Sequence, residues 1–283
     1  MRYFYLIPLF FYLTSSWSAE RQKPVYFWNS NYDSQESIAI RILPPEEFER
    51  VQVKAGSFEE WLRWLPLKKG FPPVKRFDGK LNRYKFIHFA VLDLDFGDRR
   101  SHGAAQSLEY LYAEYLFSQE YFWAVHFKLN TGKRVDLRQW QEGERPFFFL
   151  KKLNWEPKAP ESRTYENFRD FMEFVFSNTN ADSLVQELIP VTPKTDLEIG
   201  DIFIIAGTGG QAVIVLDKAV NKKTGQQVFL LGQGSEPAQE FHLLQNTTDS
   251  YLNPWYHADF GDHLITPKCV FMPEDRKRFL KEY

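Results

Sequence analysis

The chain has 283 residues, of which 43% are hydrophobic and 17% aromatic, and its formal net charge is −2. This apolar content suffices for one large hydrophobic core, and the scattered basic residues exclude the basic face of a nucleic-acid-binding protein. Cys269 is the only cysteine, which excludes an internal disulfide and a zinc site made of four cysteines. We therefore expect a globular protein without a bound cofactor or metal and without a nucleic-acid partner.

The first 19 residues are typical of a secretory signal peptide. Arg2 precedes a largely apolar run, residues 3–12, and small or polar residues follow it. The run is shorter than the roughly 20 residues that cross a bilayer, so stable membrane insertion after cleavage is not expected, and an uncleaved anchor is the alternative. We predict a secreted or periplasmic protein with a signal peptide (1–19), a polar arm (20–35) and one globular domain (36–283).

Residue patterns in the first two thirds of the chain predict a mixture of strands and helices. Alternating apolar residues indicate strands, and apolar residues three and four apart indicate helices. Ser57 and Glu60 have the spacing of a capping box, which predicts a short helix with Trp61 and Leu62 facing inward. The predicted strands are residues 37–43, 86–96, 121–129 and 147–155. The predicted longer helices are residues 101–118 and 165–176, with a short helical piece at 136–140.

The last third of the chain has the pattern of short strands joined by turns. The predicted strands are residues 201–206, 212–217, 228–231 and 239–244. Residues 221–225, reading NKKTG, predict a hairpin turn. Strands joined so closely must run antiparallel, because a parallel connection needs a crossover of a dozen or more residues. The sequence therefore predicts an α+β fold with a mainly antiparallel sheet packed against helices.

Residues 197–217, reading LEIGDIFIIAGTGGQAVIVLD, combine a Gly-Asp turn, a strand, a loop and a second strand. This arrangement resembles that of the NlpC-like, papain-related peptidases of bacterial envelopes. The resemblance implies a papain-like fold with a catalytic histidine at the start of the second strand. Here that position holds Gln211, whose amide cannot accept and return a proton near neutral pH as imidazole can.

Several motifs resemble a family of secreted bacterial proteins, the domain of unknown function 4846. They include GSFEEWLRWLPLKKG from Gly56, FAVLDLDFGDR from Phe89, YENFRDFMEFVF from Tyr165, PAQEFHLLQN from Pro237 and PWYHADFG from Pro254. Members of the family commonly have a histidine at the position of Gln211 and often a cysteine near Ala104. The resemblance implies no established activity, and both departures remove a reactive group from this chain.

Four residues are candidates for contacts with a ligand. Gln211 opens a strand, and Gln233 and Gln239 flank the following loop, GQGSEPAQ. Their amides donate and accept hydrogen bonds, which suits peptide bonds or sugar hydroxyls, and hydrogen bonding within the loop is the alternative. Trp255 lies in the loop PWYH, whose polar surroundings predict an exposed ring that contacts a ligand.

Four other residues are candidates for catalysis. Ser183 stands at a predicted helix start, where free N–H groups can bind an oxyanion, and His242 on a later strand would serve as its base. Ser183 and Gln186 also have capping-box spacing, which would give the hydroxyl a structural role. Asp93 and Asp95 project from one face of a predicted strand, where they would act as acid and base. The structural alternative is that Asp95 and Asp98 cap the turn at Gly97 while Asp93 pairs with an arginine.

These candidates give three functional hypotheses. The first is a non-catalytic or degenerate envelope protein that binds a cell-wall peptide, a glycan or a protein partner near Gln211 and Gln233. The second is an envelope peptidase, amidase or glycan hydrolase that uses Asp93 and Asp95 or the Ser183–His242 pair. The third is a structural protein without a small-molecule site.

Overall fold

The computed structural model describes residues 24–82, 87–97, 103–192, 196–207, 209–234, 238–281 and 283. The predicted signal peptide and the first residues of the predicted polar arm lie outside this described part. Within it, no helix combines the length and the apolar composition that crossing a membrane requires.

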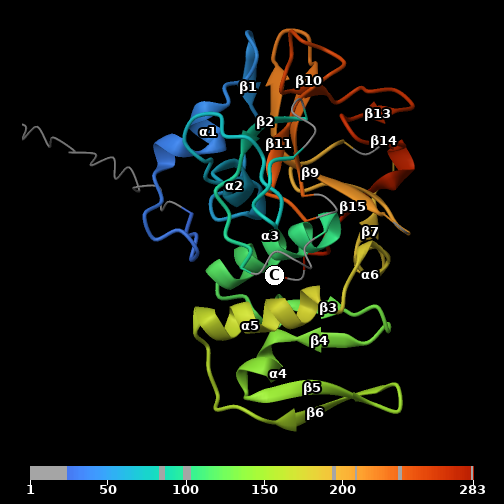
Figure 1. The fold of residues 1–283 in the computed structure, drawn as a ribbon. Coiled ribbons are helices and arrows are strands. Elements are labelled where there is room, and N and C mark those ends of the chain that lie inside the picture. The colour runs from blue at the N-terminus through green and yellow to red at the C-terminus, as the bar shows by residue number, and fades with distance from the viewer. Residues whose placement is uncertain are drawn as a thin grey trace, which may run out of the picture.

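A nine-stranded antiparallel sheet forms the centre of the molecule (Figure 1). Its strands are β1 (Phe48–Arg50), β2 (His88–Val91), β7 (Ile189–Pro190), β8 (Ile202–Ile205), β9 (Gln211–Asn221), β10 (Gln227–Gln233), β11 (His242–Leu244), β12 (Tyr256–His257) and β15 (Arg276–Arg278). The main path is β2–β11–β10–β9–β8–β15–β7, while β1 pairs with β9 and β12 with β10. The predicted α+β class is confirmed.

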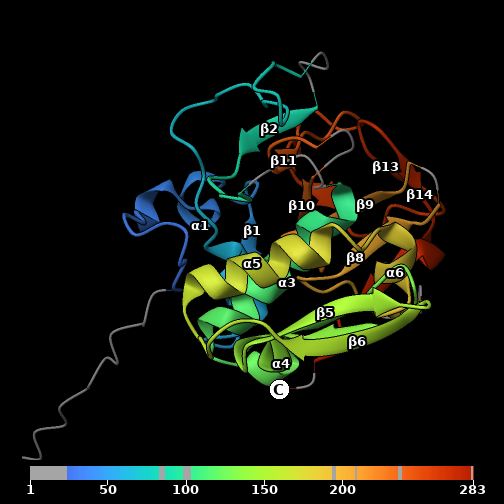
Figure 2. The ribbon, with the colours of Figure 1, turned by 60° about the horizontal axis from the view of Figure 1, so that its bottom comes forward.

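Helices cover one face of this sheet in two layers. They are α1 (Ile38–Arg41), α2 (Phe58–Arg63), α3 (Ala104–Ser118), α4 (Leu137–Gln141), α5 (Tyr165–Phe176) and α6 (Ala181–Val185). The described chain also has 3₁₀ turns η1 (Ser34–Glu36), η3 (Phe122–Ala124) and η4 (Pro273–Asp275). In Figures 1 and 2, α3 lies between the sheet and α5. Every residue from Ala104 to Phe117 is buried, so α3 is a central helix enclosed on all sides rather than one with a single apolar stripe.

Three small hairpins complete the fold. They are β3 (His126–Lys128) with β4 (Arg134–Asp136), β5 (Glu144–Phe149) with β6 (Lys152–Pro157), and β13 (Leu264–Ile265) with β14 (Val270–Phe271). The first two hairpins lie with α4 and α5 at the bottom of Figure 1. The β13–β14 segment packs on the other face of the sheet, where Phe203, Phe229 and Phe271 belong to a second, smaller core.

The predicted strand 37–43 is wrong. Residues 38–41 form α1, because Ile38 and Ile42 lie four residues apart and are both buried, whereas Leu43 is exposed. Alternation of apolar residues over so short a segment fits a helical turn as well as a strand. The choice between them depends on the surrounding core, against which Ile38 and Ile42 pack.

Three further segments also differ from their predictions. The predicted strand 147–155 is wrong, because the chain reverses at residues 150–151 and the segment forms parts of β5 and β6. The predicted strand 86–96 is regular only over β2, because β11 pairs with just these residues. The predicted strand 121–129 is reduced to β3 after a 3₁₀ turn.

Capping and periodicity account for the helices that were predicted well. Ser57 Oγ accepts a hydrogen bond from the Glu60 N–H at 3.3 Å, and the Glu60 carboxylate accepts one from the Gly56 N–H at 2.8 Å. Trp61 and Leu62 then face the core, as predicted. The predicted helix at residues 165–176 has the same bounds as α5.

Asp217, at the centre of β9, joins two distant segments to the sheet. Its carboxylate is fully buried and accepts hydrogen bonds from Arg50 Nε on β1 at 2.5 Å and from Arg63 Nε on α2 at 2.7 Å. Arg50 also donates to the carbonyl of Ile42, and Arg63 donates to that of Val51. A carboxylate with two guanidinium partners is the arrangement in which a buried charge is tolerated.

We expect Asp217→Asn to destabilise the protein by about 3–5 kcal/mol, because it leaves two partly buried guanidinium groups without their counter-charge. The measurement is urea unfolding followed by circular dichroism. Asp262→Asn, at an exposed position, is the matched control and should change the stability by less than about 0.5 kcal/mol. Equal stabilities of the two variants would contradict the role of Asp217.

Two carboxyl groups on α3 are buried and form no ion pair with any described residue. The Thr179 hydroxyl donates to Glu109 at 2.7 Å, and the Tyr165 hydroxyl donates to Glu114 at 2.8 Å. Burial raises the pKa of Glu109 to about 8 and that of Glu114 to about 7. Both groups therefore hold a proton in the folded state over a pH range in which an unfolded chain has lost it.

We expect the burial of Glu109 to make the free energy of unfolding fall as the pH rises from about 5 to 8. A carboxyl whose pKa rises from 4.5 to about 8 on folding contributes fully below pH 4.5, and this contribution disappears as the pH approaches 8. Glu109→Gln keeps the shape of the side chain but removes its titration. The free energy of unfolding of this variant should therefore fall less steeply with pH than that of the native protein, and the two slopes should differ by up to about 1.4 kcal/mol per pH unit. Urea unfolding at several pH values between 5 and 8 checks this, and parallel slopes would refute it.

Candidate functional site

Gln211, Gln233 and His242 form a row of polar side chains across three neighbouring strands. Gln233 ends β10 and lies directly opposite His242, which begins β11. Gln233 Nε2 donates to Gln211 Oε1 at 3.2 Å. Gly209, with φ of +73°, turns the chain into β9, and Gly210 lies so close to α6 that an added Cβ would be 2.7 Å from that of Ala181. Gln211 and Gln233, two of the three glutamines expected to line one site, are therefore in contact, while their role in ligand binding stays a prediction.

The inner part of this polar row has unused hydrogen-bonding capacity. Gln233 and His242 are fully buried, while Gln211 is half-buried and donates to the Gly209 carbonyl at 3.0 Å. Within the described residues, Gln233 Oε1, His242 Nε2 and His88 Nδ1 are buried without a hydrogen-bond partner. The rings of His88 and His242 are 6.2 Å apart. Because buried polar atoms are normally satisfied, this row is an unusual feature of the sheet.

His242 does not have the properties of a general base. Its Nδ1 lies 2.9 Å from the Glu240 carbonyl, which assigns the proton to Nδ1. Burial lowers the pKa of His242 to about 3, so the ring is neutral near pH 7. A general base works best when its pKa lies near the working pH. Among the described residues, no group of three or more His, Cys, Asp or Glu side chains is placed to hold a metal ion.

Ser183 has a structural role in α6. Its N–H donates to Asn180 Oδ1 at 3.0 Å, and its hydroxyl accepts from the Asn180 N–H and donates to the Asn180 carbonyl, both at 2.9 Å. The capping box therefore starts at Asn180, and the predicted box of Ser183 with Gln186 is wrong. Ser183 is almost fully buried, and its hydroxyl is directed to Asn180.

Asp93 and Asp95 are exposed and point to different partners beyond the end of β2. Asp93 accepts from Asn29 Nδ2 at 3.3 Å. Asp95 accepts from the Gly97 N–H at 3.0 Å and lies 3.6 Å from Arg169 Nη1. The turn cap by Asp95 matches the structural alternative, and Asp98 lies outside the described residues. The predicted pairing of Asp93 with an arginine is wrong, because Arg169 lies beside Asp95 and Asp93 contacts Asn29.

Gln239 and Trp255 have contacts apart from the glutamine pair. The Gln239 side chain accepts a hydrogen bond from Asn82 Nδ2 at 2.6 Å, and its backbone forms an isolated antiparallel β-bridge with that of Arg76. The prediction that Trp255 is exposed is wrong, because the side chain is 1% exposed and its Nε1 donates to the Leu43 carbonyl at 2.9 Å. A polar loop sequence around a tryptophan does not show which way the ring turns.

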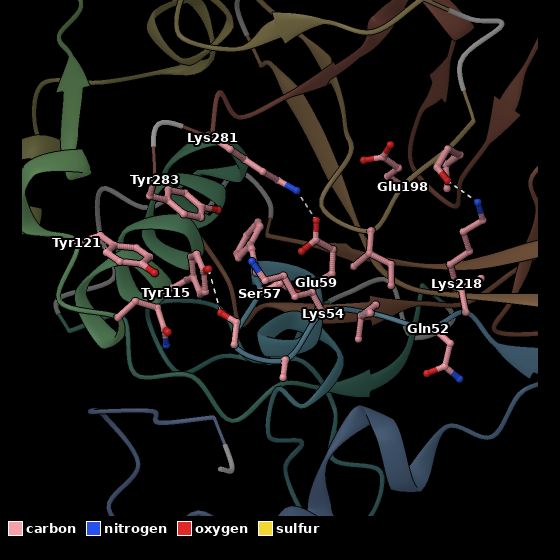
Figure 3. Close-up of a pocket in the computed structure, with 18 residues that line it drawn as sticks. Gln52, Lys54, Ser57, Glu59, Tyr115, Tyr121, Glu198, Lys218, Lys281 and Tyr283 are labelled. Carbon is pink, nitrogen blue, oxygen red and sulfur yellow. Dashed lines mark hydrogen bonds and ion pairs between the residues drawn. The ribbon is translucent and has the colours of Figure 1, made fainter. Parts of the chain in front are cut away.

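A separate cavity of about 680 Å³ opens between five segments that are distant in sequence (Figure 3). Its walls come from residues 51–59, the end of α3 with the residues up to Tyr121, residues 197–199, Lys218 on β9, and the C-terminal residues Lys281 and Tyr283. Tyr121 and Tyr283 stack with their ring centroids 5.0 Å apart, and Tyr115 lies beside Tyr283 at 5.7 Å. The volume lies within the range of small-molecule sites. Sequence reasoning missed this cavity because no local motif joins its walls.

The charged groups of the cavity differ in how far they are compensated. Glu59 and Lys281, which come from two different walls of the cavity, form an ion pair (Figure 3). Lys218 is nearly buried, its ammonium donates to the Leu197 carbonyl at 2.6 Å, and burial lowers its pKa. Lys54 is exposed and has no ion-pair partner among the described residues. The cavity therefore combines aromatic faces with a few polar groups, as ligand sites commonly do.

The comparison with known families identifies the chain. Residues 38–278 match the family described as domain of unknown function (4846). The chain belongs to this family. No curated protein and no solved structure matches it. The papain-like fold is therefore not confirmed, and the resemblance to NlpC-like peptidases stays a prediction.

We expect Gln233→Leu to stabilise the protein by about 1 kcal/mol, because it removes a buried acceptor that lacks a partner while Gln211 can bind water instead. Urea unfolding measures the change. Gln211→Leu is the contrasting variant and should destabilise the protein by about 1–3 kcal/mol, because it leaves the buried Gln233 Nε2 without its acceptor. A loss of more than about 1 kcal/mol in Gln233→Leu would show that the amide contributes to folding.

Proposed function

We propose that the protein is an exported, non-catalytic member of the bacterial cell envelope that binds a wall-derived peptide or glycan. The cavity between residues 51–59 and the C-terminal end of α3 is the site that supports this best. It offers three tyrosine rings, Tyr115, Tyr121 and Tyr283, on one side. Aromatic faces with nearby amides and charged groups suit sugar rings and short peptides.

The local contacts of the catalytic candidates support binding over hydrolysis. A nucleophile needs an adjacent base, and the Ser183 hydroxyl is engaged by Asn180. His242 is neutral and buried. Asp93 and Asp95 each serve a different local contact.

The glutamine pair is a second candidate site for the same ligand class. Gln211 is half-buried at the start of β9, and the buried Gln233 retains an acceptor without a partner in the described chain. An amide pair of this kind would recognise a peptide bond through one donor and one acceptor. The cavity ranks first because it encloses a volume that a ligand can fill.

We expect a soluble disaccharide–tetrapeptide of the bacterial wall to bind the protein, and Tyr121→Ala to weaken this binding roughly tenfold by removing a stacking face. Isothermal titration calorimetry measures the affinity. Tyr251→Ala is the matched control, because Tyr251 is 97% exposed and does not line the cavity.

Other outcomes would place the function elsewhere. If Gln211→Ala abolishes binding while Tyr121→Ala does not, the glutamine pair is the site. Turnover of the same fragment by the native protein, lost in Asp93→Asn, would refute the non-catalytic proposal.

A further inference from the structure

The β5–β6 hairpin ends in a cluster of exposed apolar side chains. Phe147 is 36% exposed, Phe148 41%, Phe149 63% and Leu150 81%. In Figure 1 this hairpin lies at the opposite end of the molecule from β1 and β10, and Figure 2 shows it on the outer side of α4 and α5. Four successive apolar residues at one tip form a patch of the kind that marks an interaction surface.

The two residues of the turn at this tip have an unfavourable backbone conformation. Phe149 pairs with Lys152, so Leu150 and Lys151 form a two-residue turn. Their φ angles are +47° and +64°, in the left-handed region that Asn-Gly sequences normally occupy in such turns. Glycine would relieve this strain but would remove a large apolar and a cationic side chain from the outermost point of the hairpin.

The charge of the tip is entirely positive. Residues 146–155, reading PFFFLKKLNW, contain two lysines and no acidic residue. Lys151 and Lys152 are both exposed and have no ion-pair partner in the described part of the chain. The acidic residues nearest in sequence are engaged, since Gln139 donates to Glu144 and Lys158 pairs with Glu156. An anionic surface therefore complements the tip.

The distribution of the apolar residues distinguishes a bilayer from a protein groove. Successive side chains of a strand point to opposite faces, so Phe148 lies on one face of the hairpin and Phe147 and Phe149 on the other. Both faces are exposed at the tip. A partner groove that receives one face would leave the other in water, whereas the interfacial zone of a bilayer surrounds both.

We propose that the β5–β6 tip docks the protein onto an anionic lipid bilayer. Phe148, Phe149 and Leu150 enter the boundary between headgroups and acyl chains, where aromatic and aliphatic side chains are stable. Lys151 and Lys152 remain at the level of the phosphate groups, to which each contributes electrostatic attraction. This inference is independent of the proposed cavity ligand and concerns a different surface.

The first test is flotation of the full chain with phosphatidylcholine vesicles that do or do not contain an equal part of phosphatidylglycerol. We expect Phe149→Ser combined with Leu150→Gly to weaken binding to the anionic vesicles at least tenfold. Leu150→Gly should not impair folding, because glycine relieves the backbone strain of the turn. Leu43→Gly combined with Phe71→Ser is the matched control, since both residues are exposed outside the hairpin. Lys151→Gln with Lys152→Gln should weaken binding roughly thirtyfold.

The second test reports on the tip alone. In a Cys269→Ser background, Leu150→Cys carries a polarity-sensitive fluorophore, whose emission should shift to the blue with anionic vesicles and not with neutral ones. The same fluorophore at Leu43→Cys is the control and should not shift. An unchanged spectrum at position 150 would overturn the proposal. Equal flotation of the native protein and the tip variants, or no flotation of either with anionic vesicles, would overturn it as well.

Discussion

Asp217 accepts hydrogen bonds from Arg50 on β1 and Arg63 on α2, and the chain between these two arginines supplies residues 51–59, one wall of the cavity. The position of this wall therefore depends on one buried carboxylate in the centre of β9. Desolvation makes such a cluster a weak source of net stability. It still constrains the geometry, because both guanidinium groups must lie beside the same buried carboxylate. The cavity is in this sense a by-product of how β1 and α2 are fastened to the sheet.

The two candidate sites follow different physical principles. In the polar row, burial has suppressed acid–base chemistry: His242 is neutral, and Gln233 retains only hydrogen-bonding capacity. In the cavity, solvent reaches aromatic faces and charges that are partly paired, which permits exchange with a ligand. The polar row could fix the orientation of a ligand through hydrogen bonds, and the cavity provides the contact area that a ligand needs. Membership of the family sets no activity against which to choose, so the choice depends on accessible volume.

Local patterns predicted the elements whose determinants are local. Periodicity and capping indicated α5 and the helix after Ser57, and the close spacing of the last strands required antiparallel pairing, which also brought Gln211 beside Gln233. Residues 37–43 and Trp255 were mispredicted, because their burial depends on partners far away in the chain. The cavity could not be predicted at all, since its walls meet only after the sheet, α3 and the C-terminal residues are assembled.

The enclosure of α3 has a consequence for how the molecule comes apart. This helix contacts the sheet on one side and the layer of α5 on the other, and its side chains are buried from Ala104 to Phe117. Separation of either the sheet or the α5 layer from α3 would expose α3 to water. Local opening around α3 therefore has a high free energy. The backbone amides of α3 should exchange with solvent only when both layers unfold together, as one cooperative unit.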